Sequence, residues 1–258
     1  MIQLAKEAGV EIRDGAKAIA VNQKDESCSV KIIQNQRPLE LKSRFVIGAD
    51  GAASVVRRSL FPQLKVQYSV PIRECYDGAL DLKKDYFHWF FPKSRARPRF
   101  CLNHKGDCFL IEGSGIKELR KEINKILAGY GFDPNSKPLW RDGCMLPLLH
   151  NALLDGSFRP AEGNILLIGD AAGLLFPISF EGIGTALKSG VLAADCIARS
   201  AEQDGKASTI YLQELEIILK AIRSLHAWNK KLEQEVLKGA VELSKALKAA
   251  YGETLKVR

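Results

Sequence analysis

The chain has 258 residues, of which 46% are hydrophobic and 26% are charged, and its formal net charge is +8. This length and balance allow a sizeable hydrophobic core and exclude a disordered chain. No apolar run reaches the roughly 18 to 20 residues of a membrane-spanning helix, and the N-terminus shows no signal-peptide pattern, so we expect a cytoplasmic protein. The positive charge is not accompanied by a nucleic-acid-binding motif, and we expect no nucleic-acid partner.

Helices and strands alternate along the chain. Turn residues at Asn22 to Glu26 and at Asn35 to Pro38 predict a β-hairpin in the first segment. A single helix is expected near Lys117 to Gly129, inside a strand-rich region. Near the C-terminus, apolar residues at helical spacing predict an amphipathic helix that packs on a core or a partner. These residues are Leu212, Leu215, Leu219, Ile222 and Leu225.

An apolar strand at residues 45–48 leads into an Asp-Gly turn. Asp50 closes the strand, Gly51 permits the tight turn, and Ser54 is suited to cap the next helix. Arg57 or Arg58 is then placed to meet a cofactor phosphate. The alternative is a capping turn with a solvated arginine pair.

Aromatic residues crowd the segment from Asp85 to Lys93. Side chains alternate along a strand, so Phe87, Trp89 and Phe91 are expected on one face, where they would form an aromatic wall. Ordinary sheet core is the alternative. Basic residues follow the wall, and they suit an anionic headgroup, the phosphate of NADPH or a membrane surface, with solvated charge as the alternative. They are Lys93, Arg95, Arg97, Arg99 and Lys105.

The segment from Gly163 to Gly190 predicts a strand, a glycine-rich turn and a helix of small residues. The apolar run at residues 165–168 is typical of a strand that is buried on both faces. Asp170 lies at its carboxyl end, where open α/β sheets bind ligands and a carboxylate can accept hydrogen bonds from ribityl hydroxyls. Gly169 and Gly173 allow the backbone to approach a ligand closely.

After Pro177, the sequence Glu181-Gly182-Ile183 begins a helix whose first turn carries little side-chain bulk. Its free N–H groups and positive dipole end are expected to be accessible. A helix N-terminus in this position would stabilise the negative charge of a reduced flavin near N1 and O2.

Together, these last two segments resemble the second FAD motif of the geranylgeranyl reductase family, within the flavoprotein monooxygenase-like oxidoreductases. Residues 45–58 resemble the Asp-Gly motif of that family, and residues 85–93 resemble its Tyr-x-Trp-x-Phe-Pro-Lys signature. Phe87 stands where the family has tyrosine, and Phe180 stands where the family usually has glycine.

The resemblance implies FAD as the cofactor, with NADPH or another reductant as the electron source. The implied cofactor-binding residues are Ala18, Asp50, Gly51, Arg57, Gly169, Asp170, Gly173, Pro177, Gly182 and Ile183. The implied prenyl-lipid-binding residues are Phe87, Trp89, Phe91 and Lys93. No catalytic residue is assigned. A thiol such as Cys101 or Cys144 is a conceivable proton donor, with an inert cysteine as the alternative. The six cysteines show no metal-ligand spacing, and we expect reduced thiols and no metal site.

The resemblance covers nearly the whole chain but only the later part of the family fold. The strand, Gly-x-Gly-x-x-Gly turn and helix that hold the FAD diphosphate in the family are not found in this sequence. We expect an α/β protein with a partial, Rossmann-like FAD-binding domain at residues 1–62 and 161–205. A β-rich substrate domain is inserted at residues 63–160, and a helical region follows at residues 206–258. A separate N-terminal chain that supplies the diphosphate site is an expected partner.

The resemblance predicts a flavin-dependent oxidoreductase that reduces carbon–carbon double bonds of a prenyl lipid, such as a geranylgeranyl group, at a membrane surface or in the cytoplasm. An FAD-dependent aromatic monooxygenase is one alternative, and the aromatic strand favours the reductase over it. The other is a truncated, non-catalytic remnant that no longer holds FAD, which the missing glycine motif favours.

Overall fold

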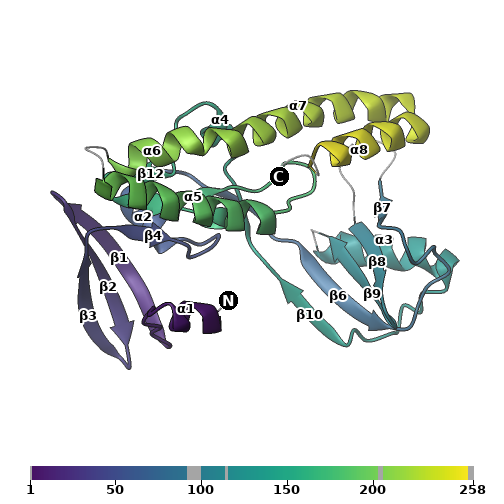
Figure 1. Cartoon of the computed structure of the whole chain (residues 1–258). Helices are drawn as coiled ribbons and strands as arrows, with labels where there is room; N and C mark the ends of the chain where they lie inside the picture. The colour runs from purple at the N-terminus through teal and green to yellow at the C-terminus, as the bar shows by residue number, and fades with distance from the viewer. Residues whose placement is uncertain (1, 92–99, 114–115, 203–205, 255–258) are drawn as a thin grey trace. The chain divides into compact units, whose positions relative to one another are not determined.

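The computed structural model describes residues 2–91, 100–113, 116–202 and 206–254 (Figure 1). Its mixture of helices and strands confirms the predicted α/β class. The chain divides into two compact units, each built from segments that are distant in sequence. The first unit comprises Met1–Lys65, Phe158–Ala172 and Ala186–Leu215, and the second comprises Val66–Ser157, Gly173–Thr185 and Glu216–Arg258.

The first unit contains two three-stranded sheets and four α-helices or parts of them in the described residues. Its elements are α1 (Ile2–Glu7), β1 (Ala16–Lys24), β2 (Ser27–Gln34), β3 (Arg37–Ser43), β4 (Val46–Gly48), α2 (Val55–Leu60), β12 (Ala161–Glu162), β13 (Ile165–Leu167), the 3-10 helix η2 (Gly169–Ala172), most of α5 (Ile183–Glu202) and α6 (Ala207–Glu214).

Strands β1, β2 and β3 form an antiparallel meander, coloured purple in Figure 1. Asp25 lies in the first turn with a φ of 53°, and Asn35 and Gln36 form the second turn with φ values of 50° and 62°. Two-residue hairpin turns require such left-handed residues, which Asn and Asp adopt more readily than most residues do. The predicted hairpin is confirmed, and a third strand extends it.

The second sheet of this unit places β4 parallel to β13, with β12 on the outer side of β13. Leu167 pairs with Gly48, and a Cβ atom on Gly48 would lie 2.6 Å from the Leu167 side chain. The strand at residues 165–167 is fully buried, as its apolar run predicts. Because β4 and β13 are parallel neighbours, the turns that carry Asp50 and Asp170 leave the same edge of the sheet.

The second unit contains a five-stranded antiparallel sheet in the order β10-β6-β9-β8-β7 and a two-stranded sheet of β11 and β5. Its elements are β5 (Gln67–Ser69), β6 (Ile72–Asp77), β7 (His88–Phe90), β8 (Phe100–Lys105), β9 (Cys108–Gly113), α3 (Ile116–Leu127), the 3-10 helix η1 (Ala128–Tyr130), β10 (Trp140–Gly143), β11 (Leu146–Leu148), α4 (His150–Leu154), α7 (Glu216–Lys238) and α8 (Ala240–Thr254). The predicted helix near Lys117 to Gly129 is therefore confirmed.

Helix α3 lies on one face of the five-stranded sheet (Figure 1). Its apolar residues Leu119, Ile123 and Leu127 are buried in one cluster with aromatic residues of the sheet, such as Tyr76 and Phe109. The strand pairing puts Trp89, Cys101, Glu112, Arg73 and Asp142 in one row across the opposite face. The face of the sheet toward α3 thus carries the buried apolar cluster, and the other face carries a row of chemically mixed residues.

Helices α7 and α8 lie side by side and are joined at Gly239, whose φ is 110° (Figure 1). Leu232 and Leu243 are buried between them, and Phe91 and Trp228 pack against this cluster. The predicted C-terminal helical region is broken into α6, α7 and α8. Leu215, Ile222 and Leu225 are fully buried, which agrees with the predicted amphipathic pattern. Of the helices that the structure describes, none is long and apolar enough to cross a membrane.

Candidate functional site

The Asp50 carboxylate accepts hydrogen bonds from the turn that follows it and from the start of α2. Ser54 Oγ donates to Asp50 Oδ1 at 2.6 Å, and the backbone N–H groups of Val55 and Val56 donate to Oδ2 at 2.6 and 3.1 Å. Ser54 Oγ in turn accepts from the N–H of Arg57 at 2.8 Å, so the predicted N-cap of α2 is confirmed. The carboxylate thus satisfies N–H groups at the start of a helix, which stabilises the motif.

Gly51 has a φ of 71°, which favours glycine, and a Cβ atom there would meet nothing within 4 Å. The turn is therefore open on that side.

Strand β1 contains an irregularity, where the register shifts between Ala18 and Ala20 and leaves Ile19 without a partner in β2. Such a bulge breaks the ladder of backbone hydrogen bonds beside Ala18, which is one of the predicted cofactor-binding residues.

Arg57 is almost completely buried, with 1% of its surface exposed. Its Nη1 atom donates to the carbonyl oxygens of Asp170 and Ala171 at 3.2 and 2.7 Å, and its Nη2 atom donates to the carbonyl of Ala52. The guanidinium therefore joins the Asp-Gly turn to the turn after β13. The structure gives Arg57 this structural role, and contact with a cofactor phosphate stays a prediction. Arg58 is exposed and donates to the carbonyl of Ala53.

The turn after β13 is held tightly but leaves its carboxylate available. Gly169 has a φ of 53°, its N–H donates to Ser189 Oγ at 3.0 Å, and a Cβ atom on it would lie 2.9 Å from Ala186 Cβ. Asp170 is half-buried, and burial raises its carboxyl pKa while the nearby Arg57 lowers it. Among the described residues, no side chain or N–H group donates a hydrogen bond to the Asp170 carboxylate.

These observations test whether the first unit fits an FAD molecule. A ribityl chain offers hydroxyl donors, and the half-buried carboxylate of Asp170 supplies acceptors that the fold itself does not use. Asp50 differs, because its acceptors are taken by α2. The open side of Gly51 allows a ligand to approach the backbone. The residues present therefore fit the cofactor, and Asp170 is the position with the clearest chemical role.

The remaining predicted cofactor residues, Gly173, Pro177, Gly182 and Ile183, fall in the second unit. Gly173 has a φ of 72°, and a Cβ atom on it would lie 2.6 Å from Leu149 Cβ, so a larger residue would displace α4. Pro177 is buried, Gly182 is half-buried and Ile183 is exposed. The structure brings these residues into one loop that leads into α5.

This loop contains two non-glycine residues in the left-handed region. The φ values are 78° at Ile178 and 54° at Phe180. Side chains with a Cβ atom resist this conformation, so glycine would adopt it at position 180 more readily than phenylalanine does. The Phe180 ring lies 6.5 Å from the His150 ring, and His150 Nε2 lies 2.7 Å from the Leu175 carbonyl oxygen. Burial lowers the pKa of His150.

Helix α5 begins at Ile183, two residues later than predicted. Glu181 Oε1 accepts from the N–H of Gly184 at 2.8 Å, and Thr185 Oγ1 donates to the carbonyls of Leu174 and Gly182. The expectation of a fully accessible helix N-terminus is therefore wrong in one respect. A carboxylate from the chain itself already occupies part of the positive end of this helix.

The aromatic wall forms as the alternation predicts. The ring centroids of Phe87 and Trp89 lie 6.0 Å apart, and those of Trp89 and Phe91 lie 5.9 Å apart. Phe87 precedes β7 and is 53% exposed, while Trp89 and Phe91 are half-buried. Lys93, the fourth predicted lipid-binding residue, lies outside the described residues.

A cavity of about 510 Å³ opens against this wall. Its other side is formed by α8, through Ala240, Leu243, Ser244, Leu247 and Lys248. None of these α8 residues is predicted from the sequence to belong to a site. The spacing of Leu243 and Leu247 indicates an amphipathic helix, but it does not reveal which surface the apolar face meets.

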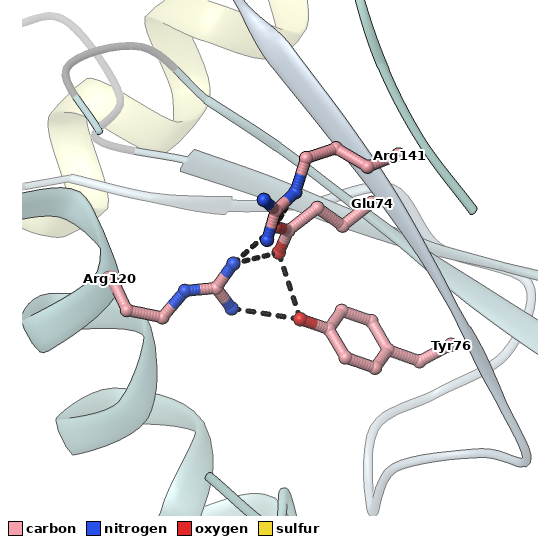
Figure 2. Close-up of polar contacts among 4 residues, drawn as sticks. All are labelled: Glu74, Tyr76, Arg120 and Arg141. Atoms are coloured by element: carbon pink, nitrogen blue, oxygen red, sulfur yellow. Dashed lines mark hydrogen bonds and ion pairs between the residues drawn. The ribbon is translucent and has the colours of Figure 1, made fainter. Parts of the chain in front are cut away.

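The second unit also contains a charged cluster that the sequence does not predict (Figure 2). Glu74 on β6 has a side chain that is 6% exposed, and it binds Arg120 of α3 and Arg141 of β10. Arg141 Nε donates to Glu74 Oε1 at 2.6 Å, and Tyr76 Oη donates to Oε2 at 2.8 Å. Burial opposes ionisation of Glu74, but hydrogen bonds from Arg120, Tyr76 and Arg141 outweigh it and lower the pKa. The cluster ties α3 and β10 to the sheet.

Cys101 has the features of an inert thiol. It lies beside Trp89 in the row across the mixed face of the sheet, and its Sγ donates to the carbonyl of Glu112 at 3.5 Å. Burial, with a smaller effect of Glu112, raises its pKa to about 12. A thiol of this kind is neither an effective nucleophile nor an effective acid at neutral pH. Cys144 is exposed.

The sequence of residues 1–76 matches the family described as "FAD binding domain". The chain is 30% identical to the chloroplastic geranylgeranyl diphosphate reductase of Arabidopsis thaliana over 179 residues, which are 62% of this chain and 34% of that protein. It is 25% identical to the digeranylgeranylglycerophospholipid reductase of Sulfolobus acidocaldarius over 242 residues, 84% of this chain and 51% of that protein. The chain spans about half the length, or less, of these curated relatives.

Two solved structures share the fold. A geranylgeranyl bacteriochlorophyll reductase-like protein from Thermoplasma acidophilum has a TM-score of 0.65 at 19% identity, over 98% of this chain and 71% of that one. CabE, an aromatic hydroxylase from angucycline biosynthesis, has a TM-score of 0.63 at 15% identity, over 99% of this chain and 52% of that one. The predicted resemblance is confirmed: residues 1–76 match an FAD binding domain, and the chain is similar in sequence to geranylgeranyl reductases.

Proposed function

We propose that this chain supplies the ribityl-binding and lipid-binding parts of an FAD-dependent oxidoreductase that reduces carbon–carbon double bonds of a prenyl lipid. The observation that carries the proposal is the cavity against Phe87, Trp89 and Phe91. Apart from Ser244 and Lys248, its described lining is apolar, which suits a hydrocarbon chain and not a small polar substrate. The names of the relatives in Arabidopsis and Sulfolobus support the same class of substrate.

Each part of this chain has a separate task in the proposed reaction. The Asp170 carboxylate accepts hydrogen bonds from the ribityl hydroxyls, and Arg57 holds the turn that presents it. The aromatic wall binds the prenyl chain and keeps water away from it. When bound, reduced FAD supplies a hydride for one alkene carbon, and the other carbon takes up a proton. NADPH or another reductant would restore the reduced cofactor.

The proposal includes a partner segment that supplies the diphosphate-binding part of the cofactor site. In the described part of the first unit, no strand pairs with the second edge of β4, where Ile47 is 40% exposed. On α5, Leu187 and Val191 form an apolar stripe that is 54% and 71% exposed. An unpaired strand edge is suited to strand addition, and exposed apolar residues are suited to burial against a partner. We propose that a polypeptide segment outside this sequence pairs with β4 there.

The proposed activity is tested with the chain complemented by a nucleotide-binding segment from a full-length relative. The flavin is reduced with dithionite without oxygen, a geranylgeranyl lipid is added, and mass spectrometry measures the saturated product. Saturation without oxygen is expected. Oxygen-dependent hydroxylation of a phenolic compound, with no anaerobic reduction, would instead support the monooxygenase class of CabE. Failure of the complemented protein to hold FAD would support the non-catalytic alternative.

A further inference from the structure

The cavity against the aromatic wall carries a charge that the proposed function does not use. Of the described residues that line it, Lys248 is the one with an ionised side chain. The three aromatic rings, Ala240, Leu243 and Leu247 provide apolar surface, and Ser244 adds a hydroxyl. The described part of this lining, apolar surface with one ammonium group, is complementary to a molecule that has a long hydrocarbon part and an anionic end.

Lys248 differs from the neighbouring lysine of the same helix. Lys245 is held by Glu242, with Nζ and Oε1 2.8 Å apart, and it does not line the cavity. Lys248 is exposed, and no carboxylate of the described residues forms an ion pair with it. A lysine keeps its charge in water while its methylene stem covers apolar surface. Lys248 can therefore contact a hydrocarbon chain and an anion at once.

We propose that Lys248 recognises the phosphate of a single-chain prenyl phosphate or diphosphate whose hydrocarbon part packs against Phe87, Trp89 and Phe91. This inference rests on the proposed function and adds a residue that determines specificity. The size of the cavity favours one chain, because about 510 Å³ lies in the range that holds one ligand of drug-like size.

The test measures, by isothermal titration calorimetry, the binding of geranylgeranyl diphosphate and of geranylgeraniol to the 258-residue chain. The two ligands share the hydrocarbon and differ in charge. Lys248→Gln is expected to weaken diphosphate binding about three- to tenfold, the scale of one charge-assisted contact that is partly screened by water. Binding of the alcohol should change less than twofold. The loss should shrink as salt concentration rises, because salt screens exposed charges.

Lys245→Gln is the matched control, since it removes an equal charge from the same helix outside the cavity. An equal loss of diphosphate affinity in both variants, or an equal loss for both ligands in Lys248→Gln, would overturn the role of Lys248. Tighter binding of a two-chain prenyl glycerophosphate than of the diphosphate would overturn the single-chain assignment. If the unaltered chain binds neither the alcohol nor the diphosphate, the lipid-binding proposal itself fails, and the two failures are thus distinguishable.

Discussion

The guanidinium of Arg57 donates a hydrogen bond of 2.7 Å to the carbonyl oxygen of Ala171, 114 positions later in the chain. The two residues belong to the two motifs that resemble FAD-binding sequences, and both residues lie in the first unit. A buried arginine that is bonded to backbone carbonyls can hold two turns in fixed positions. The turn that carries Asp170 is therefore set by a residue from the Asp-Gly motif.

Replacement of Arg57 by methionine should destabilise the fold by about 2 to 4 kcal/mol, because the carbonyls of Asp170, Ala171 and Ala52 lose a buried donor. Urea denaturation monitored by circular dichroism measures this change. Arg58→Met is the control, since Arg58 is exposed, and it should change stability by less than about 0.5 kcal/mol. Equal effects of the two substitutions would contradict the structural role of Arg57.

Replacement of Asp170 by alanine should lower FAD affinity in the complemented protein by about ten- to a hundredfold, the value of one lost charged hydrogen bond of about 1.5 to 3 kcal/mol. Flavin fluorescence titration measures the affinity. Asp85→Ala is the control, because Asp85 is exposed and lies in the segment before β7. If both variants retain FAD equally, Asp170 does not bind the ribityl chain.

Replacement of Glu74 by glutamine should destabilise the protein by about 1 to 3 kcal/mol, because the partly exposed Arg120 and Arg141 would lose their shared carboxylate. The neighbouring pair of Arg73 and Asp142, with atoms 2.6 Å apart, is about half exposed. Asp142→Asn should therefore cost less than about 1 kcal/mol. Chemical denaturation of both variants at neutral pH tests the contrast between a buried and an exposed ion pair.

The Glu74 carboxylate should also make the free energy of unfolding depend on pH. The pKa of Glu74 in the folded protein is lower than its ordinary value of 4.5. The ionised Glu74 side chain therefore contributes fully to the free energy of unfolding above its pKa in the unfolded chain. This contribution is lost as the pH falls through its pKa in the folded protein. Denaturation from pH 7 down to pH 3 should show a smaller loss of stability in Glu74→Gln than in the unaltered protein. Parallel pH profiles would show that another group is responsible.

Position 180 should prefer glycine to alanine. Phe180 has a φ of 54°, a conformation that costs a residue with a Cβ atom about 1 to 2 kcal/mol. Phe180→Gly should therefore be more stable than Phe180→Ala by about 1 kcal/mol, as thermal unfolding can measure. Phe87, which is exposed and is not among the described residues with positive φ, is the control. At that position alanine should equal or exceed glycine, and the same order at both sites would argue against strain.

Replacement of Trp89 by alanine should weaken the binding of geranylgeraniol by several kcal/mol, at about 25 cal/mol per Å² of apolar surface that is no longer buried. Trp140→Ala removes an exposed tryptophan from β10 outside the cavity and should have little effect. Calorimetry of the two variants gives the comparison. A similar loss of affinity in both would show that the wall does not bind the lipid.

The turns, the buried strand and the shared face of the aromatic residues could be predicted from the sequence, because each depends only on residues that are close together in the chain. The hairpin turns at Asp25 and Asn35 follow from residue types that tolerate positive φ, and the buried strand at residues 165–167 follows from its apolar run. The alternation that puts Phe87, Trp89 and Phe91 on one face is a property of any extended strand. The motifs around Asp50 and Asp170 were visible for the same reason, because each one is contiguous.

Only the tertiary structure decided how these residues are used. Asp50 and Asp170 look alike in sequence, but the first carboxylate is occupied by α2 and the second is not. The fold also decided that α8 forms a wall of the lipid cavity and that Glu74 binds Arg120 and Arg141. These contacts join segments that are distant in the chain, and their partners depend on strand order and helix packing. A local sequence pattern indicates whether a residue will be buried or charged, whereas the whole fold determines which other residue it contacts.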